Sequence, residues 1–238
     1  MGKRKSLMLE KAVQERFIDL ITNKIAIAQE EDNPIRIYKE LVHYRFDEVI
    51  TNAMPDFSEV LGSKRLDDLI FDFIQSKPTS PFVWKVPGLF MEYLVRNAKV
   101  EDIPYAQDLM WFESIEVNLL MGEYEKPKEE VFSWDERYYL TNSMEMKVLE
   151  YPVHQENFED RGEYPLIMYY HFQEYAVYFQ EITPFMFQFL NYLEGNSLCE
   201  ALDKICKDFG VEEKDEVKAL LEGALEEFVK LNIIRKRG

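Results

Sequence analysis

The stretch LIMYYHFQEYAVYFQEITPFMFQFLNYLEGNSLCE (residues 166–200) decides the fold of the C-terminal half of the chain. Its first part, 166–182, is rich in aromatic and β-branched residues and is long enough for two strands that turn near Gln173–Glu174. Thr183-Pro184 then places a capping residue before a proline at the first helical position, where the missing N–H is not needed. The stretch therefore predicts strands followed at once by helices.

The sequence around this stretch extends the same plan. Residues 138–153 are also strand-like, Ser197 and Glu200 form an S-x-x-E capping box, and Gly195 and Gly210 are expected to end the first two helices. A third helix is predicted over 212–231, and the final NIIRKR is compatible with a short strand. About three strands followed by three helices match a winged-helix-like domain, which we place at 137–238.

The N-terminal half has helical periodicity throughout. Apolar residues at helical spacing predict helices over 8–30, 34–52, 55–62, 64–76, 88–97 and 104–121, with a proline-containing loop at 77–87. The charged segment 123–136 contains Pro127 and is the best candidate for a linker. The predicted fold class is α+β, with an all-α domain at 1–122 and the winged-helix-like domain after the linker.

Composition limits the functions that the chain can have. Of its 238 residues 47% are hydrophobic, which supports a real core, and the net charge of −17 disfavours nucleic acids and anionic lipids. No apolar run is long enough to span a membrane and no signal peptide is present, so we expect a cytoplasmic protein.

The sequence offers little catalytic chemistry. The three histidines lie in separate segments, and Cys199 and Cys206 lie too far apart along one helix for a disulfide and are expected to be small buried residues. There is no phosphate-binding loop, dinucleotide motif or G-x-S-x-G motif. We therefore predict no metal site, no cofactor and no enzymatic activity for the chain alone.

A winged-helix plan raises the hypothesis of DNA binding. The third predicted helix, 212–231, carries seven acidic residues against three lysines, and only Arg235-Lys236-Arg237 is basic. Since counterion release provides much of DNA affinity, this helix favours a protein or peptide partner. A DNA-binding transcriptional regulator stays as the alternative function.

A family resemblance rests on motifs in residues 10–121. Ile37-Tyr38-Lys39 corresponds to an I-Y-R motif at the start of the family pattern. Ala53-Met54-Pro55 corresponds to a following A-F-P motif, and Leu61-Gly62 to the leucine-glycine pair that ends a helix. A later P-Y-L and L-E-W element corresponds to Pro104, Tyr105, Phe112 and Glu113, with Ser114 where the family has tryptophan. The segment resembles a bacterial family described as a DNA-binding domain, which is similar to the HvfC/BufC-like partner subunits of multinuclear non-heme iron oxidases of the methanobactin type.

The resemblance implies a non-catalytic accessory protein. Such oxidases modify cysteines in ribosomally made peptides, and their partner subunits hold the enzyme and its precursor peptide together. The motif residues that the resemblance makes candidates for the partner interface are Ile37, Tyr38, Pro55, Phe112 and Glu113.

The C-terminal half resembles the peptide-recognition element of PqqD-like proteins in its order of strands and helices. In that arrangement a leader peptide adds a strand to the sheet edge and packs on the third helix. The strand at 175–182 would be this edge. The resemblance implies peptide-binding residues at Ala176, Val177, Tyr178, Phe179 and Gln180 on the strand, and at Lys218, Glu222 and Leu225 on the third helix.

Overall fold

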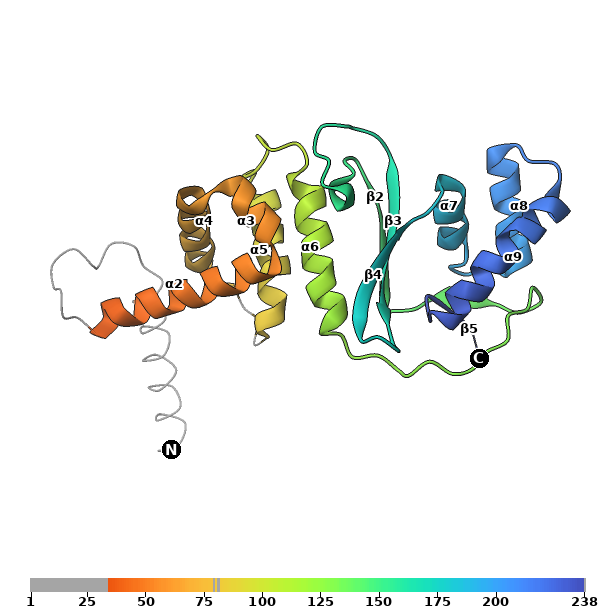
Figure 1. Ribbon diagram of the computed structural model, residues 1–238, viewed down its shortest axis with the longest axis horizontal. Helices are drawn as coiled ribbons and strands as arrows, with labels where there is room; N and C mark the ends of the chain where they lie inside the picture. The colour runs from red at the N-terminus through yellow and green to blue at the C-terminus, as the bar shows by residue number, and fades with distance from the viewer. Residues whose placement is uncertain (1–33, 79, 81, 238) are drawn as a thin grey trace, which may run out of the picture. The chain divides into compact units, whose positions relative to one another are not determined.

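The computed structural model describes residues 34–78, 80 and 82–237 (Figure 1). The helix predicted at 8–30 lies outside these residues. The chain divides into two compact units, one up to Ser114 and one from Ile115, and each is described by itself. The division falls within a helix rather than in the segment 123–136 that the sequence analysis treats as a linker.

The first unit is helical, as predicted. Its elements are α2 (Pro34–Ala53), α3 (Pro55–Leu61), α4 (Ser63–Gln75), the 3-10 turn η2 (Val83–Lys85), α5 (Val86–Arg96) and the start of α6 (Ala106–Leu120). Pro55 occupies the first turn of α3, and Gly62 ends that helix at a φ of +72°. The buried core includes Ile50, Met54, Phe57, Ile70, Phe73, Phe90 and Leu94.

The prediction of a loop over 77–87 is wrong for the second half of that segment. Residues Val83–Lys85 form a 3-10 turn and α5 begins at Val86. Pro87 lies in the first turn of α5, where a proline lacks only an N–H that the helix would not use. A proline-containing stretch can therefore begin a helix as well as interrupt one.

The second unit contains two small antiparallel sheets. β2 (Met144–Leu149), β3 (Tyr164–His171) and β4 (Ala176–Glu181) form one in the order β2-β3-β4, and β1 (Tyr138–Leu140) pairs with β5 (Ile234–Lys236) in the other. The turn after β3 covers 172–175, where it was predicted, and Tyr175 closes it at a φ of +54°. The predicted strand region 138–153 thus contributes one strand to each sheet, with the short turn η3 (Val153–Gln155) after them.

Three helices follow the sheet, as predicted: α7 (Pro184–Tyr192), α8 (Leu198–Phe209) and α9 (Lys214–Lys230). The Thr183 hydroxyl accepts a hydrogen bond from the Met186 N–H, Ser197 and Glu200 form the capping box, and Gly210 ends α8 at a φ of +66°. Ile167 and Tyr169 of β3 share a buried core with residues of all three helices, among them Phe189, Leu202, Leu225 and Phe228. The predicted α+β fold class is confirmed.

A buried polar network ties the β1–β2 turn to the α9–β5 turn. The Thr141 hydroxyl donates to the Asn232 carbonyl at 2.6 Å, and the Asn232 side-chain amide donates to the Ser143 hydroxyl at 3.1 Å. Asn232 is buried and has a φ of +60°, a conformation that asparagine tolerates better than most residues. The network fixes the place where β5 leaves α9 to pair with β1.

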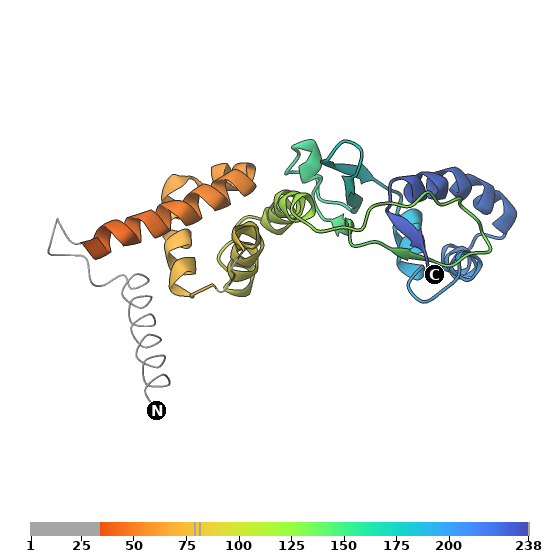
Figure 2. The ribbon, with the colours of Figure 1, turned by 90° about the horizontal axis from the view of Figure 1, so that it is seen from below.

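The segment after α6 belongs to the second unit. The ring of Tyr124 lies 5.3 Å from that of Tyr170 on β3, and burial raises the pKa of Tyr124 to about 12. Further along, 125–137 lies beside β5, which both Figure 1 and Figure 2 show. Across the part of the chain that the structure describes, no helix is both long and apolar enough to cross a bilayer.

Candidate functional site

Strand β4 lies at one edge of the three-stranded sheet, where the sequence analysis placed it. Tyr178 pairs with Tyr169 of β3, and the Ile182 N–H donates to the Pro165 carbonyl at 2.9 Å. Because hydrogen-bonded pairs alternate along an antiparallel ladder, the N–H and C=O groups of Val177, Phe179 and Glu181 point away from β3. These groups have the direction needed to receive a further strand.

The register decides which side chains of β4 face the helices. Tyr178 stacks on Tyr169 with ring centroids 6.2 Å apart, and Tyr169 belongs to the core shared with α7–α9. Ala176 and Gln180 lie on this same side because side chains alternate along a strand. Val177, Phe179 and Glu181 lie on the other face, a choice that the sequence analysis left open.

Phe179 and Glu181 contact the turn η3 on that other face. The ring of His154 meets that of Phe179 edge to face at 5.9 Å. His154 Nε2 and the Gln155 side-chain amide both contact Glu181 Oε1. The hydrogen bond from His154 lowers the pKa of Glu181, so this carboxylate is ionised at neutral pH.

The opposite end of β4 carries a second carboxylate. Glu174, in the β3–β4 turn, accepts a hydrogen bond from the Tyr178 hydroxyl, which raises the pKa of Tyr178. Tyr175 in the same turn is 77% exposed. The edge therefore has exposed aromatic side chains along it and a carboxylate at each end. His154, Gln155 and Glu174 lie outside the predicted strand and were not among the predicted site residues.

The third-helix residues of the predicted groove are not equivalent. Leu225 is 0% exposed and belongs to the core, so its side chain faces the interior of the unit rather than the surface that a peptide would meet. Lys218 places its ammonium 5.1 Å from the ring centre of Trp134, and Glu222 is exposed. Helix α9 packs on α8 and β5, which is why its apolar stripe is used internally.

One carboxylate of α9 does act on the β3–β4 aromatic pair. Burial, and to a lesser extent the charge of Glu227, raise the pKa of Tyr169. Tyr169 stacks on Tyr178, so the charge of Glu227 acts on the strand next to the β4 edge. Glu227 lies five residues after the predicted Glu222. A helix predicted from sequence without exact bounds does not distinguish these two positions.

Two of the N-terminal motif elements, Ala53-Met54-Pro55 and Phe112-Glu113, meet inside the first unit. Glu113 is 7% exposed, and its carboxylate accepts hydrogen bonds from the Asp56 N–H at 2.8 Å and the Phe57 N–H at 3.1 Å. These N–H groups belong to the first turn of α3, which begins at Pro55, and such groups have no acceptor within their own helix. Because the Glu113 side chain is buried, it is not exposed for an interface with a partner. It extends from α6 and caps the N-terminus of α3. Phe112 beside it is half-buried.

The two interface candidates on α2 are at the surface. Ile37 and Tyr38 on α2 are 55% and 49% exposed, and Leu41 and Tyr44 on the same helix are exposed as well. Ile37, Leu41 and Tyr44 recur at i, i+4 and i+7, so they lie on one side of α2. This exposed apolar stripe is a surface that a protein partner can cover.

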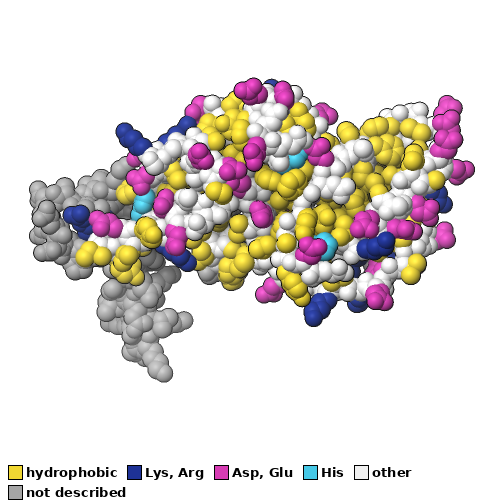
Figure 3. All heavy atoms as spheres, in the orientation of Figure 1, with side chains coloured by type: hydrophobic (Ala, Val, Ile, Leu, Met, Phe, Trp, Pro, Cys, Tyr) yellow, Lys and Arg dark blue, Asp and Glu magenta, His cyan; other side chains and the backbone are white. Residues whose placement is uncertain are grey.

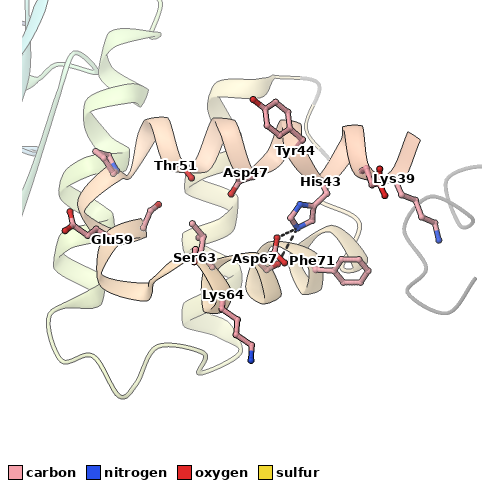
Figure 4. A pocket seen from close by; sticks show the side chains of 14 residues that line it. Lys39, His43, Tyr44, Asp47, Thr51, Glu59, Ser63, Lys64, Asp67 and Phe71 are labelled. Atoms are coloured by element: carbon pink, nitrogen blue, oxygen red, sulfur yellow. Dashed lines mark hydrogen bonds and ion pairs between the residues drawn. The ribbon is translucent and has the colours of Figure 1, made fainter. Parts of the chain in front are cut away.

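A groove of about 1040 Å³ lies among α2, α3 and α4 of the first unit (Figure 4). His43 points across it to Asp67, with Nε2 3.3 Å from the carboxylate and 3.4 Å from the carbonyl of that residue. The His43 ring also lies 6.2 Å from that of Phe71, so it packs against that aromatic side chain. Both charge signs line the groove, and this mixture selects no particular ligand.

The basic C-terminal end is already paired with acidic residues. Arg235 is buried, and its guanidinium lies 3.4 Å from Glu125 and 3.9 Å from Glu130. Glu130 also accepts the Lys236 N–H at 3.0 Å, and the Lys236 ammonium lies 3.4 Å from Glu136. The segment 125–136 thereby pairs two of the three basic residues of 235–237 with carboxylates.

The remaining chemical groups do not form a centre. Within residues 34–78, 80 and 82–237, no three His, Cys, Asp or Glu side chains are grouped so that they could hold a metal ion. Cys206 is buried and burial raises its pKa, whereas Cys199 is exposed, which corrects the expectation that both are buried. The two thiols are free, as the spacing predicts.

A family model matches part of the chain. The model described as "HvfC C-terminal domain" matches residues 143–229, a range that contains the β2-β3-β4 sheet, α7, α8 and nearly all of α9. No curated protein matches the chain. The match supports an HvfC-like family, and it falls on the half from which the PqqD-like plan was inferred rather than on the motifs in 10–121.

Proposed function

We propose that this chain is a non-catalytic partner subunit that binds a multinuclear non-heme iron oxidase and the leader of a ribosomally made peptide. The single observation that carries the proposal is that the HvfC-like region has an edge strand, β4, with backbone groups directed outward. The iron and the oxidation would belong to the partner enzyme, and this chain would present the substrate.

The peptide would bind by adding a strand to β4. Val177, Phe179 and Glu181 direct N–H and C=O groups away from β3, and a peptide strand at this edge can form main-chain hydrogen bonds with them. Main-chain pairing provides affinity for any extended segment, and the side chains beside the edge select among segments.

The oxidase would bind elsewhere, at the apolar stripe of α2. Ile37, Leu41 and Tyr44 are exposed at helical spacing, and clustered exposed apolar residues on a helix favour burial against another protein. Two separate surfaces on two separate units would let the subunit hold enzyme and peptide at the same time.

Co-expression of the chain with an adjacently encoded iron oxidase and a small cysteine-containing precursor tests the proposal. We expect all three to co-purify on a tag placed on this chain. Ile37→Glu with Leu41→Glu should remove the oxidase and keep the peptide, since buried carboxylates without partners are costly at an apolar interface. Val177→Pro should remove the peptide and keep the oxidase. A complex that neither variant disturbs would contradict both assigned surfaces.

For the alternative, DNA-binding function, we expect no measurable binding of duplex DNA at physiological salt. The chain has a net charge of −17, and Arg235 and Lys236 are engaged by Glu125, Glu130 and Glu136. Fluorescence anisotropy with a labelled random-sequence duplex is the measurement. Sub-micromolar affinity that falls steeply with salt and disappears in Arg235→Gln with Lys236→Gln would establish the regulator function instead.

A further inference from the structure

The sheet that carries the β4 edge is strongly acidic. Residues 141–183, which contain the sheet and its connections, have eight Asp and Glu against two Lys and Arg, and 212–231, which contains α9, has seven against three. Asp and Glu side chains are also spread widely over the face of the molecule that Figure 3 shows. An edge in these surroundings attracts positive charge.

Two of these carboxylates lie at the edge itself, and a third, Glu227 of α9, acts on Tyr169 of the neighbouring strand. Glu181 is on β4 itself, Glu174 bonds the Tyr178 hydroxyl, and the charge of Glu227 reaches Tyr169, on which Tyr178 stacks. Glu227 has Lys230 at 3.6 Å, but residues 172–183 contain no Lys or Arg at all. Of the two cations in 141–183, Lys147 lies on β2 at the far edge of the sheet, and Arg161 pairs with Glu150 at 2.8 Å.

We propose that the strand which β4 accepts is cationic, with Lys or Arg placed two residues from an apolar residue. This inference rests on the proposed function and adds the chemical class of the peptide. Phe179 and Glu181 lie on one face of the sheet, two residues apart. An added strand that places an apolar side chain beside Phe179 places the next side chain on that face beside Glu181, where a cation forms a cross-strand ion pair.

A second copy of the chain fits this edge less well. Pairing β4 with β4 of another copy would bring together two chains that each carry a net charge of −17. Such a pair would also bring the Glu174 and Glu181 carboxylates of one copy near those of the other, where like charges opposite each other destabilise a sheet. The charges therefore favour a cationic peptide over self-association.

Three labelled peptide probes test the inference with the full chain. The cationic probe is Lys-Thr-Val-Thr-Lys-Thr-Val-Thr-Lys, which puts Lys and Val on one face of an extended strand. The acidic probe replaces each Lys with Glu, and the third probe has the composition of the first but places Lys next to Val, on opposite faces. Fluorescence anisotropy at low salt should give the cationic probe an affinity at least about tenfold higher than that of either other probe.

Two double variants that remove the same charge distinguish the effect of the carboxylates at the β4 edge from that of the overall negative charge of the chain. Glu174→Gln with Glu181→Gln should weaken the cationic probe about fivefold, because both carboxylates at the ends of β4 are neutralised. Glu194→Gln with Glu212→Gln removes the same charge from the α7–α8 and α8–α9 connections and should change the affinity less than about twofold. Circular dichroism spectra should be unchanged in both.

The outcomes distinguish the charge inference from the proposed function. If the acidic probe binds as tightly as the cationic one and Val177→Pro abolishes both, the edge binds peptides but the inference about their charge is overturned. Equal effects of the two charge-matched variants would overturn it as well. If the cationic probe binds and Val177→Pro has no effect, peptide binding at the β4 edge itself is overturned.

Discussion

Replacing Glu113 with alanine is expected to lower the free energy of unfolding of the first unit by about 3 kcal/mol. Its carboxylate is buried and accepts hydrogen bonds from the Asp56 and Phe57 N–H groups at the start of α3. Alanine leaves both N–H groups without this acceptor, and hydrogen bonds to a charged group are about twice as strong as neutral ones. Glu113→Gln keeps one acceptor oxygen and should show a smaller loss.

Denaturant unfolding followed by circular dichroism measures this loss, and amide exchange at Asp56 and Phe57 localises it. Glu116→Ala is the matched control, since Glu116 lies on the same helix, α6, with an exposed side chain. Equal stability of the Glu113→Ala and Glu116→Ala variants would show that the cap contributes nothing. Glu113 would then have to be explained by a partner after all.

Replacing Val177 with proline is expected to weaken leader-peptide binding by at least about 30-fold without unfolding the chain. The Val177 N–H points away from β3, so its loss leaves the β3–β4 ladder intact. A peptide strand, however, would lose that donor and would meet the proline ring in the plane of the sheet. Loss of one hydrogen bond and exclusion of close pairing together account for the size of the effect.

The neighbouring position supplies the control for the Val177 variant. The Tyr178 N–H is directed toward β3, so Tyr178→Pro should break the ladder and destabilise the sheet, which thermal unfolding will detect. A Val177→Pro protein with a native melting temperature and unchanged peptide affinity would eliminate this edge as the site. A Val177→Pro protein as unstable as Tyr178→Pro would contradict the assigned hydrogen-bond direction.

Local features of the fold were predictable because their causes are local. Thr183-Pro184, the Ser197–Glu200 capping box and Gly210 each fix a helix end through a few neighbouring residues, and all three are confirmed. The edge position of β4 was implied by the resemblance to the PqqD-like order of strands and helices, and β4 does lie at an edge of the three-stranded sheet. The division of 138–153 between two sheets depends on β5, at the far end of the unit, and no local pattern encodes it.

The candidate site was predictable only in part, for the same reason. Alternation identified two sets of side chains on β4, but burial of Tyr169 against the helices was needed to say which set faces them. His154 meets Glu181 across 27 positions of sequence, and Glu113 meets Asp56 across 57. Such pairings follow from tertiary structure, so a motif containing Glu113 looks the same whether it caps a helix or contacts a partner.

The pairing of β1 with β5 has a consequence for synthesis of the protein. β1 opens the sheet-containing part of the second unit, and its only partner strand among the described residues comes after α9. On the ribosome, the β2-β3-β4 sheet and the first helices can form while β5 is still in the exit tunnel. Two sets of contacts can form only when translation has passed residue 236. They are the hydrogen bonds among Thr141, Ser143 and Asn232 and the ion pairs of Arg235. Until then the segment 125–140 lacks its partner, so a nascent chain arrested before β5 should be cleaved there by a protease that spares the finished protein.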